Sequence, residues 1–303
     1  MLTRYIERHL TWIDLVSPTA GEVRSLMEEF NIDPSFGNEL LTSSYKPKVE
    51  RRGDLIYVVL HFPLLRAIGN VPEEEIDFLI GKDFLITARY QPSGPLHSFA
   101  KAFEVSSVLG TGRSMMHGGH LFAAMAQNLY RALLSECDVL ERRLEDTEEH
   151  IFKGDERSMV LRLSHIGRTI HDFRQRLQSH KEMLASLEPY ATRMFGQDFL
   201  FYVRVVQGEY ERVRTMLEHL REALVELRET NNSLLSTKQN DIMRAFTIIA
   251  FLFLPLSFVA SLFQMNTRYT PLIGMPGDFW YIVGFMLLLT AGFFVYFKRK
   301  GWL

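Results

Sequence analysis

Cysteine is almost absent from this sequence, because Cys137 is the only one among 303 residues. An intramolecular disulfide is therefore excluded, and a single thiol is typical of a chain in a reducing compartment. A strong net charge is also missing, since 34 Lys and Arg residues nearly balance 36 Asp and Glu residues and leave a formal net charge of −2. No overall field attracts nucleic acid, and we expect no nucleic-acid partner.

The motifs that mark most enzymes are missing as well. The sequence has no nucleophile–base constellation, no phosphate-binding loop and no cysteine array for zinc. A glycine-rich stretch at 110–120, GTGRSMMHGGH, has neither the spacing nor the preceding strand of a nucleotide-binding loop. His117 and His120 within it are a weak candidate metal pair, and we interpret the stretch mainly as a hinge or helix start. We therefore expect a protein that is not an enzyme and holds no cofactor.

An apolar leader is absent from the N-terminus. The segment MLTRYIERHLTWIDLV has no continuous apolar core, so we expect no signal peptide. The sequence is rich in charge up to residue 240, whereas residues 241–303 are mostly apolar. Any information that directs the chain to a membrane is therefore expected in the C-terminal part.

Two long apolar runs lie in that C-terminal part. The first, at 242–263, has about 22 residues, which at 1.5 Å per residue give a helix of roughly 33 Å, long enough to cross a bilayer core. The second lies at 279–297 and is followed by a basic tail at 298–303. A short loop at 264–278 separates them. The sequence therefore predicts two transmembrane helices joined by an extracytoplasmic loop.

Basic residues gather at the outer ends of these two runs, whereas the loop between them has only Arg268. By the positive-inside rule, both termini and the whole region before the first run are expected in the cytoplasm, and the chain is expected in the inner membrane. The flanking basic residues are Lys238, Arg244, Lys298, Arg299 and Lys300.

Residues 1–118 show mixed signals and predict a cytoplasmic α/β domain, called the head below. Helices are expected at 18–30, 34–41 and 96–109. About five mostly antiparallel strands are expected, at 11–17, 76–80 and 84–88 and in a hairpin that starts at residue 48.

Residues 119–241 show only helical periodicity and predict a set of long helices, called the stalk below. Gly154 breaks the first helix, and Pro189 is expected to end the second. The third begins near Asp198 and meets no proline before Pro255, so it is expected to continue into the first apolar run. Its apolar stripe is typical of coiled-coil packing, and we interpret it as core.

One face of the first predicted transmembrane helix carries a polar stripe. This stripe can be interpreted in two ways. Steps of three or four residues from Asn240 alternate amides and hydroxyls with apolar side chains. Such a face suits a water-filled ion path that Met243 and Leu254 narrow. Alternatively, the hydroxyls bond to carbonyls of their own helix and pack against neighbours. The residues alone leave both interpretations open. The face comprises Asn240, Met243, Thr247, Ala250, Leu254, Ser257 and Ser261.

A pore would require several copies of the chain. Two helices enclose no lumen, so a functional polar stripe implies a symmetric oligomer with one such helix per subunit around the axis.

Six stretches of the sequence match the motifs of a known family. They are WIDLVSPT at 12–19, NDIMRAFT at 240–247, FLPLS at 253–257, QMN at 264–266, MP at 275–276 and the KRKGWL ending. In these stretches the sequence resembles the CorA-type magnesium transport family, including its ZntB-type zinc branch. The resemblance implies a funnel-shaped homopentamer with an α/β head, a long helical stalk and two C-terminal transmembrane helices, the first of which lines a cation pore.

The resemblance also implies that Asn240, Met243, Leu254, Ser257 and Asn266 occupy pore positions. Gln264, Met265 and Asn266 are the candidate selectivity residues at the pore mouth. The family signature is Gly-Met-Asn, and Gln264 replaces the glycine that lets a helix end turn tightly. Mg²⁺ gives up its waters reluctantly, so five Asn266 amides are expected to hold it with its waters on.

Regulation by intracellular metal, bound between subunits at acidic side chains, is a further implication of the resemblance. The sequence does not pair such residues, and the regulatory site stays unknown. Acidic residues in the right regions include Asp77, Asp83, Asp198 and Glu209.

The expected function is transport of Mg²⁺, with Co²⁺ or Ni²⁺ as further substrates, through an oligomeric pore. Zn²⁺ prefers nitrogen and sulfur ligands, and the pore face offers mainly oxygen, which favours Mg²⁺. Two alternatives stay open: a Zn²⁺ transporter, with or without proton coupling, and a non-transporting oligomeric membrane scaffold or sensor. The expected partners are further copies of the chain, the lipid bilayer and divalent metal ions.

Overall fold

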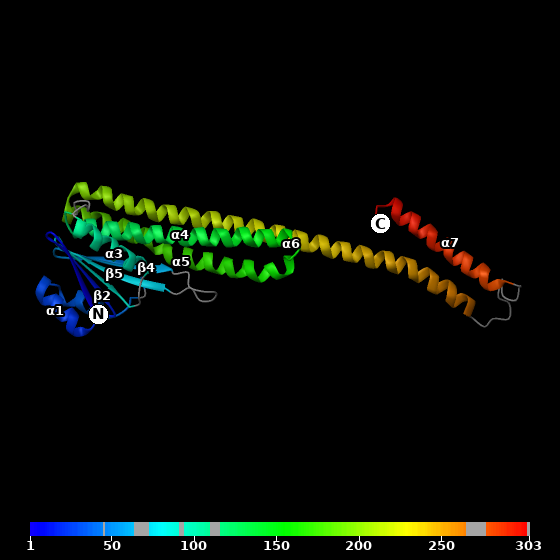
Figure 1. Cartoon of the computed structure of the whole chain (residues 1–303), viewed down its shortest axis with the longest axis horizontal. Helices are drawn as coiled ribbons and strands as arrows, with labels where there is room; N and C mark the ends of the chain where they lie inside the picture. Colours follow the sequence, from blue (N-terminus) through cyan, green and yellow to red (C-terminus); the bar gives the residue numbers. More distant parts are fainter. Residues whose placement is uncertain (45, 64–72, 91–93, 110–115, 265–276, 302–303) are drawn as a thin grey trace. The chain divides into compact units, whose positions relative to one another are not determined.

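The computed structural model describes residues 1–44, 46–63, 73–90, 94–109, 116–264 and 277–301. These residues form two compact units, Met1–Arg228 and Glu229–Leu303. Figure 1 shows the elements of both units along the chain. The predicted Met265 and Asn266 lie outside the described residues.

The first unit is built on a six-stranded sheet with the order β1-β2-β6-β5-β4-β3. Only β2 and β6 pair in parallel, and the other neighbours are antiparallel. The mostly antiparallel sheet was predicted, but with about five strands. The strands are β1 (Leu2–Glu7), β2 (Leu10–Val16), β3 (Lys48–Arg52), β4 (Leu55–Pro63), β5 (Glu73–Ile80) and β6 (Phe84–Arg89).

Strand β1 was missed for a physical reason. It is an edge strand whose residues are partly buried or exposed, and its sequence, LTRYIE, intersperses charged with apolar side chains. Because no residue of the strand is fully buried, its sequence does not alternate cleanly between apolar and polar side chains and gives a weak strand signal. The strand is held by its antiparallel register with β2, in which Tyr5 lies opposite Trp12 and stacks on it at 4.6 Å between ring centroids.

Two short helices cover one face of the sheet. Helix α1 (Ala20–Phe30) begins after Thr19, which forms a capping box with Glu22, and it ends at Asn31 in the left-handed region. Helix α2 (Pro34–Glu39) follows at once, with Asp33 as its N-cap. Apolar side chains of α1, α2 and alternate strand positions pack into one buried core, which includes Leu26, Phe36, Ile13, Tyr57, Leu79 and Ile86.

Longer helices cover the opposite face. Helix α3 (Gly94–Leu109) packs its Phe99 and Phe103 rings edge-on against Trp12, at 5.8 and 5.7 Å between centroids. Helix α4 (Gly118–Phe152) packs Phe122 against Phe78 of β5 at 5.1 Å. Successive strand residues point to opposite faces, so the sheet is buried on both sides.

Helices α4 and α5 (Glu156–Phe195) form the predicted antiparallel hairpin, and Gly154, at φ +103°, makes its turn. The prediction that Pro189 ends the second helix was wrong. Pro189 lies inside α5, which continues for six more residues to Gly196. A proline inside a helix costs about 3 kcal/mol. Burial of Leu187 and Ala191 on either side of it favours the helical path.

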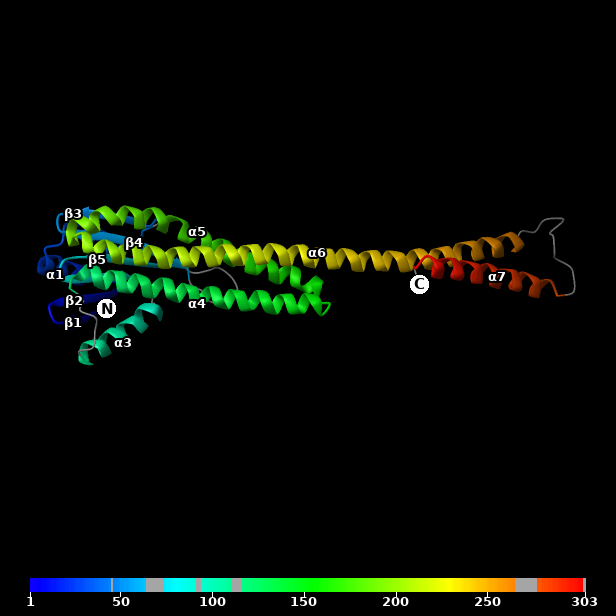
Figure 2. The ribbon, with the colours of Figure 1, turned by 90° about the horizontal axis from the view of Figure 1, so that it is seen from above.

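After a short 3₁₀ helix (Gln197–Phe199), the predicted long helix is present as α6 (Leu200–Gln264), an uninterrupted helix of 65 residues with Pro255 inside it. Within the first unit its stripe residues Val213, Leu217 and Leu220 are buried, which confirms the interpretation as core. Figure 2 shows this part of α6 beside α4 and α5. Helix α7 (Asp278–Arg299) completes the second unit.

Candidate functional site

Two helices in the described part of the chain are long and apolar enough to cross a membrane, Gln197–Gln264 and Phe279–Arg299. They contain the two apolar runs that the sequence places there. Both helices are largely exposed along these runs, with Phe253, Leu254, Leu287 and Leu288 between 65% and 75% exposed. When a single chain exposes apolar side chains on this scale, lipid or another chain is expected to cover them.

Helix α7 covers one side of α6 in the second unit. The rings of Phe251 and Phe297 lie 6.0 Å apart between centroids. Ile248 and Phe297 are 8% and 4% exposed, the most buried side chains of the two apolar runs. Partly buried positions of α6 recur at helical spacing from there, and so mark the covered side. They are Leu252, Pro255, Leu256, Val259, Ala260 and Phe263.

The predicted pore face lies on the opposite side of α6. At about 100° per residue, Met243, Leu254 and Ser261 project roughly 180° away from the centre of the covered side. Met243 is 58% and Leu254 69% exposed. Asn240, Ala250, Ser257, Ser261 and Gln264 are exposed too, and Thr247 is half-buried. The fold of one chain therefore brings all these residues to one face and leaves that face uncovered.

One hydroxyl of this face makes the bond that the alternative interpretation describes. Thr247 donates its Oγ1 proton to the carbonyl oxygen of Met243, one turn earlier, at 2.7 Å. This bond uses the hydroxyl proton and leaves the oxygen lone pairs. A lone pair is what a cation, or the water around a cation, requires. Self-bonding at Thr247 is therefore compatible with an ion path.

Large apolar side chains border the pore face on both flanks. Phe246 and Phe253 lie on one flank, and Phe258 and Leu262 lie on the other, all of them exposed. Sequence reasoning named the polar face but not these borders. The available signal was the phenylalanine spacing on either side of the serines. A polar strip between two apolar flanks is the surface expected of a helix that faces water on one side and neighbouring helices on both others.

The ends of the two spans carry the predicted basic residues. Lys238 and Arg244 are exposed on α6, and Lys298, Arg299 and Lys300 are exposed at the end of α7. The amine of Lys300 lies 5.7 Å from the Tyr296 ring centroid. Positive side chains in a last helical turn interact favourably with the helix dipole, so Lys298 and Arg299 stabilise the end of α7.

The four acidic candidates for regulation do not meet in one chain. Asp83 and Asp198 are exposed. Glu209 is buried and bound by Arg131 at 3.0 Å and Arg212 at 3.2 Å. No group of three or more His, Cys, Asp or Glu residues suited to a metal occurs among the described residues.

The fourth candidate, Asp77, is completely buried and accepts a hydrogen bond from Tyr57 Oη at 2.8 Å. Burial, followed by the charge of neighbouring Glu75, raises the pKa of the Asp77 carboxyl well above its usual range. This shift favours the protonated carboxyl, which is a poor cation ligand. In β5 the alternation of EEEIDFLI places Asp77 on the same face as Leu79, toward α1 and α2.

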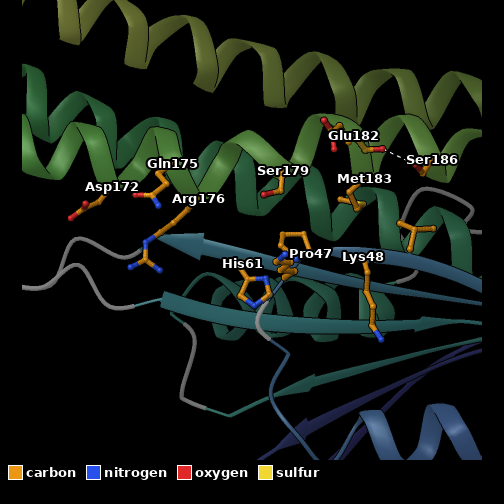
Figure 3. Close-up of a pocket in the computed structure, with 12 residues that line it drawn as sticks. Pro47, Lys48, His61, Asp172, Gln175, Arg176, Ser179, Glu182, Met183 and Ser186 are labelled. Atoms are coloured by element: carbon orange, nitrogen blue, oxygen red, sulfur yellow. Dashed lines mark hydrogen bonds between the residues drawn. The ribbon is translucent and has the colours of Figure 1, made fainter.

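A cavity of about 690 Å³ opens between the segment 46–49 and α5 (Figure 3). Asp172, Gln175, Arg176 and Ser179 line it from α5, opposite His61 of β4. Its lining carries both cationic and anionic side chains. The cavity therefore selects neither cations nor anions by charge.

The chain is similar to known proteins over nearly its whole length. The family described as "CorA-like Mg2+ transporter protein" matches residues 7–299. The "Cobalt/magnesium transport protein CorA" of Thermotoga maritima is 23% identical over 299 residues, covering 97% of this chain and 83% of the relative. The protein of the same name from Methanocaldococcus jannaschii is 23% identical over 303 residues, covering 97% and 92%.

A solved structure shares the fold over nearly the whole chain. The complete structure of the CorA magnesium transporter from Methanocaldococcus jannaschii superposes with a TM-score of 0.84 at 20% sequence identity. The superposition covers 99% of this chain and 93% of that one. The likeness therefore includes both candidate membrane helices as well as the sheet and the long helices.

Proposed function

This chain belongs to the CorA-like Mg2+ transporter protein family, and from that premise we propose that it conducts divalent metal cations, Mg²⁺ first among them, through a membrane pore. The uncovered face of α6 carries the proposal. It combines hydroxyl and amide oxygens with apolar residues at one helical spacing, opposite the side that α7 occupies. A helix that only anchored the chain would have no use for such a face.

The pore requires copies of the chain, and we propose the funnel-shaped homopentamer of the family resemblance. Each subunit contributes one α6, whose face points to the symmetry axis, while α7 lies outside. The apolar flanks with Phe246 and Phe258 then contact neighbouring subunits, which accounts for their exposure in a single chain. The rings of Met243 and Leu254 form constrictions that close by excluding water.

Selection takes place at the mouth in this proposal. Asn266, two residues after the end of α6, supplies one amide oxygen per subunit to the waters of a hydrated cation. Gln264 adds a second amide, and Met265 lies between them. Neutral amides bind without trapping a divalent ion as five carboxylates would. Oxygen donors along the remaining face favour Mg²⁺ over Zn²⁺.

The direction of flow follows from the orientation. In this proposal the head (1–118), the stalk (119–241) and the basic tail (298–303) lie in the cytoplasm and the loop 264–278 lies outside, which the basic residues at the outer ends of the spans support. The membrane potential contributes about 2.3 kcal/mol per charge per 100 mV, or about 4.6 kcal/mol for a divalent ion. A negative interior therefore drives uptake across the inner membrane.

Metal uptake into proteoliposomes tests the function. Purified protein should take up Mg²⁺, and Co²⁺ or Ni²⁺ more weakly, along an inward-negative potential. Asn266→Ala should lower Mg²⁺ uptake at least tenfold, because each subunit loses its amide from the ring. Leu288→Ala, at a 75% exposed position of α7, is the matched control and should leave uptake unchanged.

Other outcomes separate the alternatives. Uptake of Zn²⁺ in preference to Mg²⁺, dependent on a pH gradient, would replace Mg²⁺ with Zn²⁺ as substrate. No metal uptake from a folded oligomer would refute transport and favour a scaffold or sensor.

A further inference from the structure

Two histidines at the start of α4 lie ring against ring. The centroids of His117 and His120 are 3.9 Å apart, with 39° between the ring planes. His117 is the N-cap residue, with an extended backbone, and His120 lies in the first turn of the helix. They are remote in sequence from the pore face, and the proposed transport mechanism does not use them.

The backbone beneath this pair is held in place. The Gly118 amide donates to the Lys82 carbonyl at 2.8 Å, and the His9 ring shares a hydrogen bond of 3.0 Å with the Met116 carbonyl. A Cβ on Gly118 would lie 2.4 Å from the carbonyl oxygen of Gly81. The start of α4 thus docks directly onto the turn between β5 and β6, so the two imidazoles project from a fixed base.

Aromatic rings enclose the pair. Phe195, at the end of α5, stacks on His117 at 4.1 Å with 8° between the planes. Tyr202, in α6, meets His120 edge-on at 4.4 Å, and Phe199 contacts both histidines. These three rings, Phe195, Phe199 and Tyr202, therefore join the start of α4 to the junction between α5 and α6.

The Nδ1 atoms of both histidines are buried and have no hydrogen-bond partner among the described residues. Buried polar atoms nearly always have a partner, and two such nitrogens on neighbouring rings suggest one that both can share. Phe195 and Phe199 offer none. A cation that accepts lone pairs from both rings would satisfy both atoms.

Burial disfavours the charged form of both imidazoles. Burial, followed by the neighbouring His120, lowers the pKa of His117 to about 4. Burial also lowers the pKa of His120. A neutral imidazole keeps one nitrogen lone pair that a metal can accept.

We propose that His117 and His120 bind a borderline divalent transition metal, Zn²⁺, Co²⁺ or Ni²⁺, through their Nδ1 atoms. Mg²⁺ is excluded because it prefers oxygen ligands. No third His, Cys, Asp or Glu joins the pair within the described residues, so water completes the coordination. Metal–nitrogen bonds of about 2.1 Å at a tetrahedral angle place ring centroids roughly 5 Å apart, so the rings part by roughly 1 Å on binding.

Zinc binding to the full-length protein in detergent tests this site separately from transport. Equilibrium dialysis should give one more Zn²⁺ per chain for the wild type than for His117→Gln or His120→Gln, each of which should bind at this site at least tenfold more weakly. His171→Gln, at an exposed position of α5, is the matched control and should retain the wild-type count. Mg²⁺ should not displace the extra Zn²⁺.

Equal Zn²⁺ counts in the wild type and both pair variants would overturn the proposal. A second measurement avoids dependence on variant folding. Crystals of the wild type grown with Zn²⁺ should show an anomalous peak between the two Nδ1 atoms, and a peak absent there while present elsewhere would also refute the site. Mg²⁺ uptake by His120→Gln should equal that of the wild type, so a failure here leaves the proposed transport function standing.

Discussion

At the scale of single residues, the carboxyl of Asp77 gives the protein a pH-dependent stability. Its pKa is raised in the folded state by burial and by Glu75, whereas in the unfolded chain it titrates near 4. A raised carboxyl pKa means that the unfolded state ionises first as the pH rises. The contribution of Asp77 to stability is therefore full below about pH 4 and declines as the pH rises from there to the raised pKa of the folded state.

Asp77→Asn should remove this decline. Asparagine mimics the protonated carboxyl and keeps an oxygen for the Tyr57 hydroxyl, which lies 2.8 Å from Asp77 Oδ2. Thermal unfolding in detergent should show the variant at least as stable as the wild type at pH 8, with an advantage that shrinks as the pH falls to 5. Parallel unfolding temperatures of the two proteins over this range would contradict the assignment. Asp83→Asn, at an exposed position, is the control.

Sequence reasoning reaches such residues only in part. Asp77 and Glu209 were grouped with Asp83 and Asp198 because all four are acidic. Their difference comes from partners distant in the chain: Tyr57 lies on another strand, and Arg131, which binds Glu209, lies on another helix. Local pattern does not encode which side chain a buried carboxylate meets. That the predicted pore residues share one face of α6 was predictable, by contrast, because helical spacing alone determines which residues share a face.

At the scale of elements, two glycines in helices have opposite roles. Gly118 begins α4 where its backbone touches the turn between β5 and β6, and an added Cβ would lie 2.3 Å from the Phe84 carbonyl oxygen. Gly208 lies inside α6, and an added Cβ there has nothing within 4 Å. The first glycine is required by packing, whereas the second only weakens its helix.

Gly118→Ala should therefore destabilise the first unit by about 1–3 kcal/mol or more, since backbone carbonyls cannot move aside as a flexible side chain does. Gly208→Ala should stabilise the protein by about 0.5–1 kcal/mol. Thermal melts of the two variants in the same detergent measure both effects. A similar change in both variants would refute the close docking of α4 onto the sheet.

The elements themselves were mostly predictable, apart from strand β1 and the position where α5 ends. The uninterrupted α6 followed from the lack of proline between Asp198 and Pro255, and the turn at Gly154 followed from its glycine. Pro189 did not end α5, because a single lost hydrogen bond is outweighed when buried residues such as Leu187 and Ala191 continue the same packed face. Local propensity determines where a helix ends only when the residues on either side of the break are weakly buried.

At the scale of the whole molecule, the geometry of α6 supports the proposed assembly. A face with polar residues is uncovered, and the flanks beside it are apolar. Symmetric closure around that face buries the flanks and leaves the polar strip on the axis, whereas a monomer in lipid would expose the serines to hydrocarbon. Because the family resemblance implies a homopentamer, we expect the purified protein to have about five times the chain mass of 35.2 kDa by light scattering after subtraction of detergent.

Engineered cysteines test which face of α6 meets the axis. Cys137 is the only native cysteine and is buried, so Cys137→Ala gives a background without thiols. Ser257→Cys in that background should form disulfide-linked dimers on mild oxidation, because around the axis identical positions lie close together. Each cysteine can pair only once, so a ring of five should yield at most two dimers and one unlinked chain. Leu287→Cys, exposed on α7, should stay unlinked, because α7 lies outside the ring. The reverse pattern, with linkage at Leu287 and none at Ser257, would mean that α7 rather than α6 lies next to the axis. The polar face of α6 would then not line the pore.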